Sequence, residues 1–386
     1  MMPSHLQDEV FMQRALRLAA DTAALASPNP HVGCVLVRDN QIFAEGAHIY
    51  DQRDHAEIVA LKQAAERGFS TKGATAYVTL EPCSHHGRTG PCADALIAAG
   101  IARCVIATVD PNPLVSGQGV AKLQAAGIEV TAGVLQQQAR GLNEAFAHFI
   151  RTRTPFVTLK AALSVDGKLA PPLASRFPNQ PHWLTGPAAR AQVHLLRHAS
   201  DAVLTGIGTV LADNPLLTDR SEIDAPDGQS RRRPLLRVVL DTHLRTPLTS
   251  QLLLSAQDDL LILCGDTASQ EKIAALQAHG AQVESIPHYA GRLSLPAVLT
   301  CLAERDILSL LLECGSHLNG SFLRQNLVDK VILIYAETEL GDQAIPFAQG
   351  IASPYLFEQS LHHITRTTLG SDAFVTGYIH DPWPPP

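Results

Sequence analysis

The chain has 386 residues, 46% hydrophobic and 17% charged, which is typical of a folded protein long enough for two domains. A formal net charge of −7 argues against a general nucleic-acid-binding protein, because such a protein needs a basic surface. Seven cysteines are too few for a disulfide framework and favour a reducing compartment. Residues 1–9 lack the features of a signal peptide, and no apolar run approaches the roughly 20 residues of a membrane span. We expect a cytoplasmic protein.

Residues 1–150 predict an α/β domain in which strands alternate with helices. Apolar residues at helical spacing predict a helix from Asp8, the expected N-cap, to Leu25. Two β-rich runs, 32–37 and 42–47, flank a hairpin signal. We then expect a helix at 55–66, a strand at 76–80, a helix at 92–99, a strand at 103–108, and a final helix and strand that end at Thr131. This order predicts a three-layer α/β/α fold.

A metal-ligand pattern stands in this half of the chain. His55 and Glu57 are followed by Cys83 and Cys92, each cysteine directly after a proline. One imidazole and two thiolates are three zinc ligands, and three protein ligands leave the fourth tetrahedral position to water, as in catalytic sites. Zinc lowers the pKa of that water to about 7, and Glu57 can carry the proton to a leaving amine. The H-x-E…P-C pattern is the signature of zinc-dependent deaminases of nitrogen bases.

One detail of this pattern is unusual, because the second cysteine commonly follows at P-C-x-x-C spacing and here lies nine positions on. We expect His55, Cys83 and Cys92 each at the start of a helix, where N–H groups and the helix dipole favour thiolate over thiol. The competing interpretation is that the cysteines are buried core thiols and the histidine a surface residue of a helix.

The stretch from Glu81 to Cys92 resembles the deaminase half of a bifunctional family of riboflavin biosynthesis, the pyrimidine deaminase/reductases. Asn29-Pro30-His31-Val32-Gly33 and Asp110-Pro111-Asn112-Pro113 stand where that family has them. The resemblance implies a cytidine-deaminase-like domain. It also implies that the substrate is contacted by Asn29, His48, Arg88, Asp110 and Asn112.

Simpler explanations exist for some of these residues. Arg88 is also explained as a solvated loop charge, and Asp110 and Asn112 as turn formers ahead of prolines. Asp54, where the family commonly has proline, is expected to cap the following helix or to hydrogen-bond His55.

Residues 151–381 are expected to form a second α/β domain, after the polar, proline-terminated segment 151–155. Strands are expected at 156–164, 202–205, 235–240, 260–264, 281–286, 309–313 and 328–336, with a turn at 165–168. Their alternation with helices predicts a mostly parallel sheet that binds ligands at the carboxyl ends of its strands. The proline-rich residues 382–386 are expected to be a disordered tail.

Two segments of this half, Gly206–Thr209 and Glu313–Leu323, follow strands and are rich in small residues, which lets backbone N–H groups approach an anion. Together with Thr209–Arg220 they resemble the reductase half of the same family, which has a dihydrofolate-reductase-like fold. The resemblance implies that NADPH is contacted by Ala162, Trp183, Thr209, Asp213, Thr242 and a loop of Gly315, Ser316, His317, Leu318, Asn319, Gly320 and Ser321. It implies that the substrate is contacted by Arg197, Leu217, Arg220 and Glu313.

The two arginines, Arg197 and Arg220, are expected to grip a sugar phosphate. Lys160, on the first strand, is expected near the nicotinamide, where it polarises the sugar of the substrate. Its other interpretation is a structural charge paired with a carboxylate such as Asp166.

The predicted function is a two-step enzyme of riboflavin synthesis with Zn²⁺ and NADPH as cofactors. It deaminates 2,5-diamino-6-(5-phosphoribosylamino)pyrimidin-4-one and then reduces the ribosyl group to ribityl. Two alternatives are a tRNA adenosine or nucleoside deaminase with an unrelated second domain, and a zinc-stabilised, non-catalytic interaction module. The acidic charge argues against tRNA, and Glu57 argues against the module. We expect a small phosphorylated substrate, no nucleic acid and no membrane as partners, and the sequence is compatible with a homo-oligomer.

Overall fold

The computed structural model describes residues 4–87, 90–175, 182–221 and 232–383. The chain divides into two compact units, Met1–Thr152 with Ile223–Arg233 and Pro385–Pro386, and Arg153–Glu222 with Pro234–Pro384. Within the described ranges no helix is both long and apolar enough to span a membrane.

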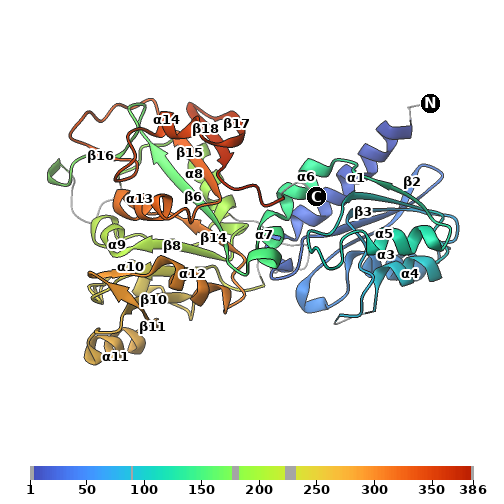
Figure 1. The fold of residues 1–386 in the computed structure, drawn as a ribbon, viewed down its shortest axis with the longest axis horizontal. Coiled ribbons are helices and arrows are strands. Elements are labelled where there is room, and N and C mark those ends of the chain that lie inside the picture. Colours follow the sequence, from blue (N-terminus) through green and yellow to red (C-terminus); the bar gives the residue numbers. More distant parts are fainter. Residues whose placement is uncertain (1–3, 88–89, 176–181, 222–231, 384–386) are drawn as a thin grey trace. The chain divides into compact units, whose positions relative to one another are not determined.

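The first unit is built on a five-stranded sheet of order β2-β1-β3-β4-β5 (Figure 1). Its strands are β1 (Gly33–Arg38), β2 (Gln41–Ala47), β3 (Thr75–Leu80), β4 (Arg103–Thr108) and β5 (Glu129–Ala132). Strand β1 pairs antiparallel with β2 and β3, whereas β3, β4 and β5 are parallel. The helices are α1 (Ser4–Asp21), α2 (Ala23–Ala26), α3 (Ala56–Glu66), α4 (Cys92–Ala98), α5 (Gln118–Ala125), α6 (Gln136–Leu142) and α7 (Glu144–Thr152), with a 3-10 turn at Tyr50–Gln52.

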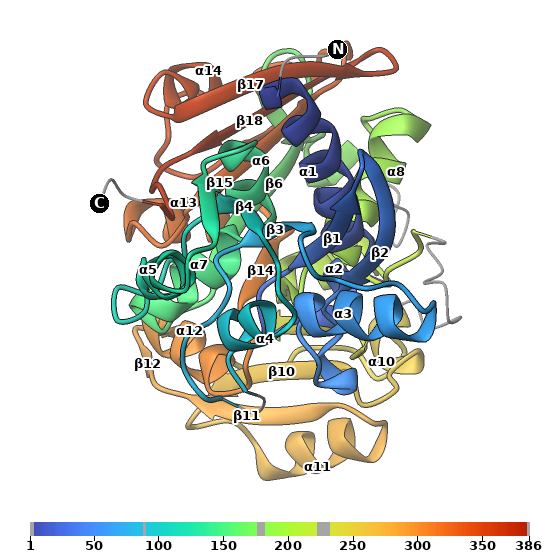
Figure 2. The same ribbon diagram turned by 90° about the vertical axis from the view of Figure 1, so that its right-hand side faces the viewer.

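Alternation along the strands gives this sheet a helical layer on each face. On β1, Val35 and Val37 pack in the cluster that contains α1, while Cys34 and Leu36 pack in the cluster that contains α3 and α4. Figure 2 shows α1 and α3 on either side of β1. The three-layer α/β/α prediction is therefore confirmed.

Two local predictions for this unit have different outcomes: the hairpin after β1 is confirmed, and the N-cap at Asp8 is wrong. The hairpin between β1 and β2 is confirmed, and its turn residues Asp39 and Asn40 have φ of 49° and 61°, as a type I′ turn requires. Asp8, in contrast, is no N-cap, because α1 begins at Ser4. Its buried carboxylate accepts hydrogen bonds from the Tyr77 hydroxyl and the Arg103 guanidinium, each of 2.8 Å. A buried charge that is paired in this way anchors α1 on the sheet.

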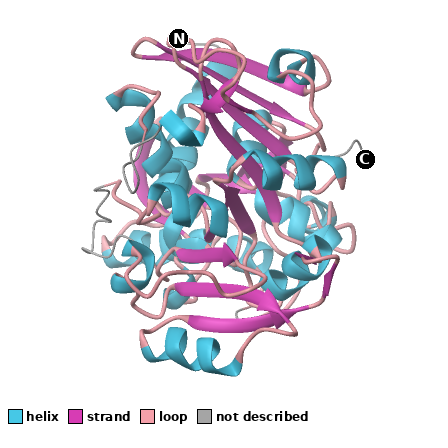
Figure 3. Cartoon of the chain, turned by 90° about the vertical axis from the view of Figure 1, so that its left-hand side faces the viewer, coloured by secondary structure: helices cyan, strands magenta, loops and turns pink. Residues whose placement is uncertain are grey.

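The second unit is built on a nine-stranded sheet of order β11-β10-β9-β8-β14-β6-β15-β18-β17. Figure 3 draws the strands in magenta and the helices in cyan. Its strands are β6 (Phe156–Leu163), β8 (Ala202–Gly206), β9 (Leu236–Leu240), β10 (Leu260–Gly265), β11 (Gln282–Ile286), β14 (Ser309–Leu312), β15 (Lys330–Tyr335), β17 (His362–Leu369) and β18 (Asp372–Tyr378). The predicted mostly parallel sheet is confirmed, and β18 and β17 pair antiparallel at one edge.

The remaining elements of this unit are helices and two small ribbons. The helices are α8 (Pro187–His198), α9 (Ile207–Asp213), α10 (Gln251–Leu254), α11 (Gln270–Ala278), α12 (Leu295–Ala303), α13 (Ser316–Arg324) and α14 (Pro354–Glu358), with a 3-10 turn at Leu173–Ser175. The ribbons are β7 (Lys168–Ala170) with β16 (Ile345–Pro346), and β12 (His288–Tyr289) with β13 (Arg292–Leu293).

The central strand β6 separates a hydrophobic core from a polar site. Leu159, Ala161 and Leu163 are buried in the large core cluster of this unit. The alternate residues Lys160 and Ala162 point to the opposite face of the sheet and are less buried. The pattern of the strand thus places a lysine on a largely buried face.

The C-terminal end of the chain differs from the prediction. Pro382 and Trp383 are buried, so the expected disorder does not begin at residue 382, and residues 384–386 lie outside the described part of the chain.

Candidate active sites

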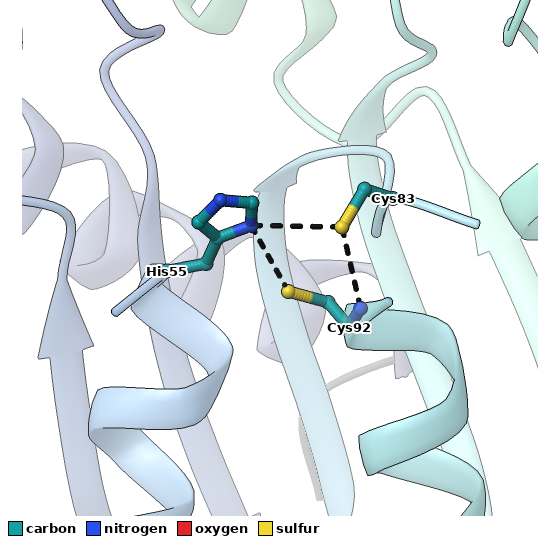
Figure 4. Close-up of side chains that lie close together, drawn as sticks. All are labelled: His55, Cys83 and Cys92. Atoms are coloured by element: carbon teal, nitrogen blue, oxygen red, sulfur yellow. Dashed lines mark hydrogen bonds between the residues drawn. The ribbon is translucent and has the colours of Figure 1, made fainter. Parts of the chain in front are cut away.

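The predicted zinc ligands converge in the first unit. His55 is the residue before α3 and Cys92 is the first residue of α4, and the sulfurs of Cys83 and Cys92 both lie close to the ring of His55 (Figure 4). Nδ1 of His55 lies 3.2 Å from Sγ of Cys92 and 3.5 Å from Sγ of Cys83. Tetrahedral zinc with ordinary Zn–N and Zn–S bonds separates such atoms by roughly 3.5 Å. The donor set and its spacing therefore fit zinc.

Cys83 is the one ligand that does not start a helix, which corrects the prediction. It lies in the segment after β3, and the backbone N–H of Cys92 donates to its sulfur at 3.3 Å. Hydrogen bonds from Cys92 and His55 lower the pKa of Cys83 well below its usual value, which outweighs the opposing effect of burial. The N-terminus of α4 thus stabilises the thiolate of Cys83 through an amide of another ligand.

Glu57 lies in the first turn of α3, two residues after the ligand histidine, and is buried. Burial raises the pKa of its carboxyl to about 7, and the nearby His55 opposes that rise. A carboxyl with this pKa exchanges protons near neutral pH, as a general acid and base must.

A histidine orients the predicted substrate residue Asn29. The ring of His48 lies edge-on to that of His55, with centroids 5.5 Å apart. Its Nδ1 is 2.8 Å from the backbone oxygen of Asp54, and its Nε2 is 3.0 Å from Nδ2 of Asn29. A carbonyl only accepts, so Nδ1 carries the proton and Nε2 accepts from the amide. The carbonyl oxygen of Asn29 is then left to accept from a ligand.

Asp54 neither caps α3 nor bonds to His55. Its carboxylate pairs with Lys62 at 2.5 Å, and its backbone oxygen serves His48. The predicted capping role is wrong, because the residue that flanks α3 is His55.

Asp110 and Asn112 act as turn formers in the segment after β4. The carboxylate of Asp110 accepts from the N–H of Asn112 at 2.8 Å, and the side chain of Asn112 accepts from the N–H of Leu114 at 3.1 Å. Burial raises the pKa of Asp110 to about 6. A turn role does not exclude substrate contact, which stays a prediction for both. Arg88 lies outside the described residues.

In the second unit, Lys160, Arg197 and Glu313 form a buried charged cluster. Arg197 donates to Glu313 from Nε at 2.6 Å and from an Nη at 3.1 Å, while Nζ of Lys160 lies 3.7 Å from the same carboxylate. Burial alone would raise the pKa of Glu313, but the two cations hold it at about 2. Lys160 therefore pairs with Glu313, and the alternative partner Asp166 instead accepts from Ser164, Leu340 and Gly341.

The two predicted phosphate arginines differ in their surroundings. Arg197 is buried, and its guanidinium is engaged with Glu313 and, at 3.0 Å, with the backbone oxygen of Thr218. Arg220 is exposed, and within the described residues no hydrogen bond or ion pair engages it. Burial and the nearby charge of Arg197 lower its pKa. Arg197 thus holds the segment that carries Arg220, and phosphate binding by the two arginines stays a prediction.

The remaining predicted reductase residues fall on several elements. Leu217 is buried with φ of 54°, in the segment that follows α9. Thr209 and Asp213 lie in α9, Ala162 in β6, Thr242 just after β9, and Trp183 is 62% exposed before α8.

The segment Gly315–Ser321 is a helix start rather than a loop, since α13 begins at Ser316. Asn319 donates to the backbone oxygen of Phe347 at 3.0 Å. A Cβ on Gly320 would lie 2.2 Å from the backbone oxygen of Gln349. Asn319 and Gly320 therefore pack α13 against the segment that contains Phe347 and Gln349. Gly315 and Ser316 lie at the N-terminus of this helix.

Three residues at these sites were not predicted. Asn143 holds the segment of Asn29, because its side chain bonds both the N–H and the C=O of His31, at 2.7 and 2.9 Å. Burial and the charges of Arg197 and Arg220 lower the pKa of His194, which places this histidine at the Glu313 cluster. Glu81 binds backbone amides near Asp110. Glu81 stands two residues before the ligand Cys83, whereas no motif in the sequence points to Asn143.

Comparisons with known proteins agree with both halves. The family model described as the cytidine and deoxycytidylate deaminase zinc-binding region matches residues 5–108, and the RibD C-terminal domain matches residues 155–370. Riboflavin biosynthesis protein RibD of Escherichia coli (strain K12) is 42% identical over 346 residues, which cover 88% of this chain and 90% of that protein.

Two solved structures are similar over nearly the whole chain. Acinetobacter baumannii RibD, form 1, has a TM-score of 0.79 at 37% identity, covering 97% of this chain and 99% of that one. A diaminohydroxyphosphoribosylaminopyrimidine deaminase/5-amino-6-(5-phosphoribosylamino)uracil reductase from Thermotoga maritima has a TM-score of 0.80 at 33% identity, with the same coverage.

The fold and the two sites define a zinc-dependent deaminase joined to a reductase. It is a bifunctional enzyme whose cofactors are Zn²⁺ and NADPH. The chain belongs to the RibD family of riboflavin biosynthesis proteins.

Proposed function

We propose that the chain deaminates 2,5-diamino-6-(5-phosphoribosylamino)pyrimidin-4-one and then reduces the ribosyl group of the product to ribityl with NADPH. The observation that carries the first step is the convergence of His55, Cys83 and Cys92 beside the buried Glu57. A zinc-stabilised interaction module has no need of a buried carboxyl with a pKa of about 7 at this position.

In the deamination, Glu57 moves the protons. His55, Cys83 and Cys92 would hold a zinc ion, which would supply a water with a pKa of about 7. Glu57 would take a proton from the attacking water as its oxygen bonds to the amino-bearing carbon. The same carboxyl returns the proton to the amino group, the C–N bond breaks, and ammonia leaves.

The pyrimidine is held by Asn29, His48, Asp110 and Asn112, with Arg88 on the ribose phosphate. The orientation of Asn29 supports this assignment, since its amide nitrogen is committed to His48 and its oxygen is left to accept from a pyrimidine N–H. An acceptor at this position favours a base edge that carries donors.

In the reduction, the exposed guanidinium of Arg220 binds the substrate phosphate, and Lys160 polarises the sugar. The charge of the cluster supports this assignment. The three positive charges of Lys160, Arg197 and Arg220 outnumber the one negative charge of Glu313, so an anion is attracted. NADPH is held by the predicted residues around α9 and by Gly315 and Ser316, where N–H groups of a helix start favour a pyrophosphate.

The deaminase domain is assigned to residues 1–150 and the reductase domain to residues 151–381. We place the enzyme in the cytoplasm, and none of the seven cysteines is in a disulfide, which supports a reducing compartment. A net charge of −7 supports small phosphorylated substrates rather than nucleic acid as partners.

The substitution Glu57→Gln tests the first step. The amide keeps the shape of the side chain but cannot shuttle protons, so deamination should fall about 100- to 10,000-fold while one zinc per chain is retained. Glu66→Gln, at the exposed end of α3, is the matched control and should behave as wild type. Turnover by Glu57→Gln within threefold of wild type, at full zinc, would remove Glu57 from the mechanism.

A further inference from the structure

The buried carboxylate of Glu81 lies directly after β3, two residues before the zinc ligand Cys83. It accepts four backbone hydrogen bonds. One oxygen accepts from the N–H groups of Asp110 at 3.0 Å and Gly117 at 2.9 Å. The other accepts from Gly119 at 2.8 Å and Val120 at 3.1 Å. Both carboxylate oxygens are therefore used to hold one distant segment.

This segment joins the predicted substrate residues to the start of α5. Gly119 and Val120 are the second and third residues of α5, whose own flanking residue is Gly117 and brings no side-chain cap. The first N–H groups of a helix have no partner within it and usually bond to a local side chain. Here a carboxylate from the metal-binding segment supplies that partner, and the same side chain fixes the amide of Asp110.

The contact is close as well as polar. A Cβ added to Gly119 would lie 2.0 Å from the backbone oxygen of Pro82 and 3.2 Å from Oε1 of Glu81. The start of α5 therefore rests against the backbone between Glu81 and Cys83 and leaves no room for a side chain. The distance between the zinc ligand and the segment of Asp110 is set by these contacts.

We propose that Glu81 is a positioning residue for deamination. It holds the segment from Asp110 to Gly117 in a fixed position relative to the zinc ligands. Asp110 and Asn112 then bind the pyrimidine so that its reacting carbon faces the metal site. The inference rests on the proposed function, in which these two residues contact the substrate. Glu81 acts through them and touches neither substrate nor metal.

The full-length variant Glu81→Gln tests this role. An amide is the same size, but its NH₂ group faces N–H donors, so two of the four hydrogen bonds are lost in either orientation. We expect one zinc per chain, a kcat within about threefold of wild type, and a KM for the pyrimidine raised about tenfold or more. Hydrogen exchange of residues 109–121 should accelerate, while that of 156–163 should not. Glu66→Gln is the control.

A second variant, Gly119→Ala, keeps the charge of Glu81 and forces α5 away from it. It should raise KM with zinc retained, as Glu81→Gln does. In a double-mutant cycle, the KM effects of Glu81→Gln and Asn112→Ala should be less than multiplicative, because part of what Glu81 positions is the substrate contact of Asn112.

The outcomes are distinguishable. An active wild type with an unchanged KM in both Glu81→Gln and Gly119→Ala would overturn the inference alone, and so would fully multiplicative effects in the cycle. Loss of zinc or of kcat at unchanged KM would show that Glu81 acts on the metal, which also overturns it. Absence of deamination in the wild type would overturn the proposed function and this inference with it.

Discussion

Replacement of Glu313 by glutamine should destabilise the second unit by an amount that depends on pH. The carboxyl has a pKa of about 2 against an ordinary value of 4.5, because Arg197 and Lys160 outweigh the cost of burial. At about 1.4 kcal/mol per pH unit this difference is worth roughly 3 kcal/mol at neutral pH. Removal of one partner of a buried ion pair typically costs about 3–5 kcal/mol, which is the same interaction measured in another way and agrees with this value.

The sign of the pH dependence follows from the lowered pKa. The stabilisation is complete above the unfolded value of 4.5 and is lost as the pH falls toward about 2. The difference between wild type and Glu313→Gln should thus shrink from roughly 3 kcal/mol at pH 7 to roughly 1 kcal/mol at pH 3.

Urea unfolding followed by tryptophan fluorescence measures this effect, because both tryptophans of the chain, Trp183 and Trp383, belong to the second unit. Glu337→Gln, an exposed glutamate after β15, is the matched control and should change the free energy of unfolding by less than about 0.5 kcal/mol. Equal stabilities of wild type and Glu313→Gln at pH 7 would refute the reasoning.

The remaining predictions concern metal, phosphate and packing. Cys83→Ser should lose most of its zinc by elemental analysis, whereas Cys264→Ser should keep it, since Cys264 is buried in the second unit; full zinc in the first variant would contradict the ligand set. Arg220→Ala should raise the reductase KM for the phosphorylated substrate by an amount equivalent to roughly 1.5–3 kcal/mol, with unchanged NADPH affinity and deamination, and normal substrate binding would contradict the phosphate role. Asp8→Ala should destabilise the first unit by about 1–3 kcal/mol in thermal unfolding, because Tyr77 and Arg103 lose a buried acceptor while Arg103 keeps Glu129, and an unaltered midpoint would contradict this.

Most strands and the zinc ligands could be predicted because the signals for them lie in nearby residues. Valine-rich runs such as Val35–Val37 favour a β-strand. The spacing of His55, Cys83 and Cys92 belongs to the motif itself. The position of Cys83 was wrong because the segment between the cysteines leaves it outside a helix, which the longer spacing did not reveal.

Features that depend on distant partners could not be predicted. Asp8 looks like a helix cap until Arg103, 95 positions away, is seen to pair with it. The sequence does not distinguish the surroundings of Arg197 from those of Arg220. Only the fold shows that the guanidinium of Arg197 is paired with Glu313. The hairpin of β17 and β18 was not predicted because β17 lies at the sheet edge and is largely exposed, so its residues show little apolar alternation.

The most direct test of the central claim is one anaerobic incubation of the purified, zinc-loaded protein with the diaminopyrimidine ribosylamine phosphate, with and without NADPH. Without NADPH, one ammonia should be released per substrate and the deaminated ribosyl product should accumulate. With NADPH, one cofactor should be oxidised per ammonia released, and the ribityl product should replace the ribosyl one. Ammonia release without any NADPH oxidation would contradict the reductase half, and no ammonia release at full zinc would contradict the deaminase half.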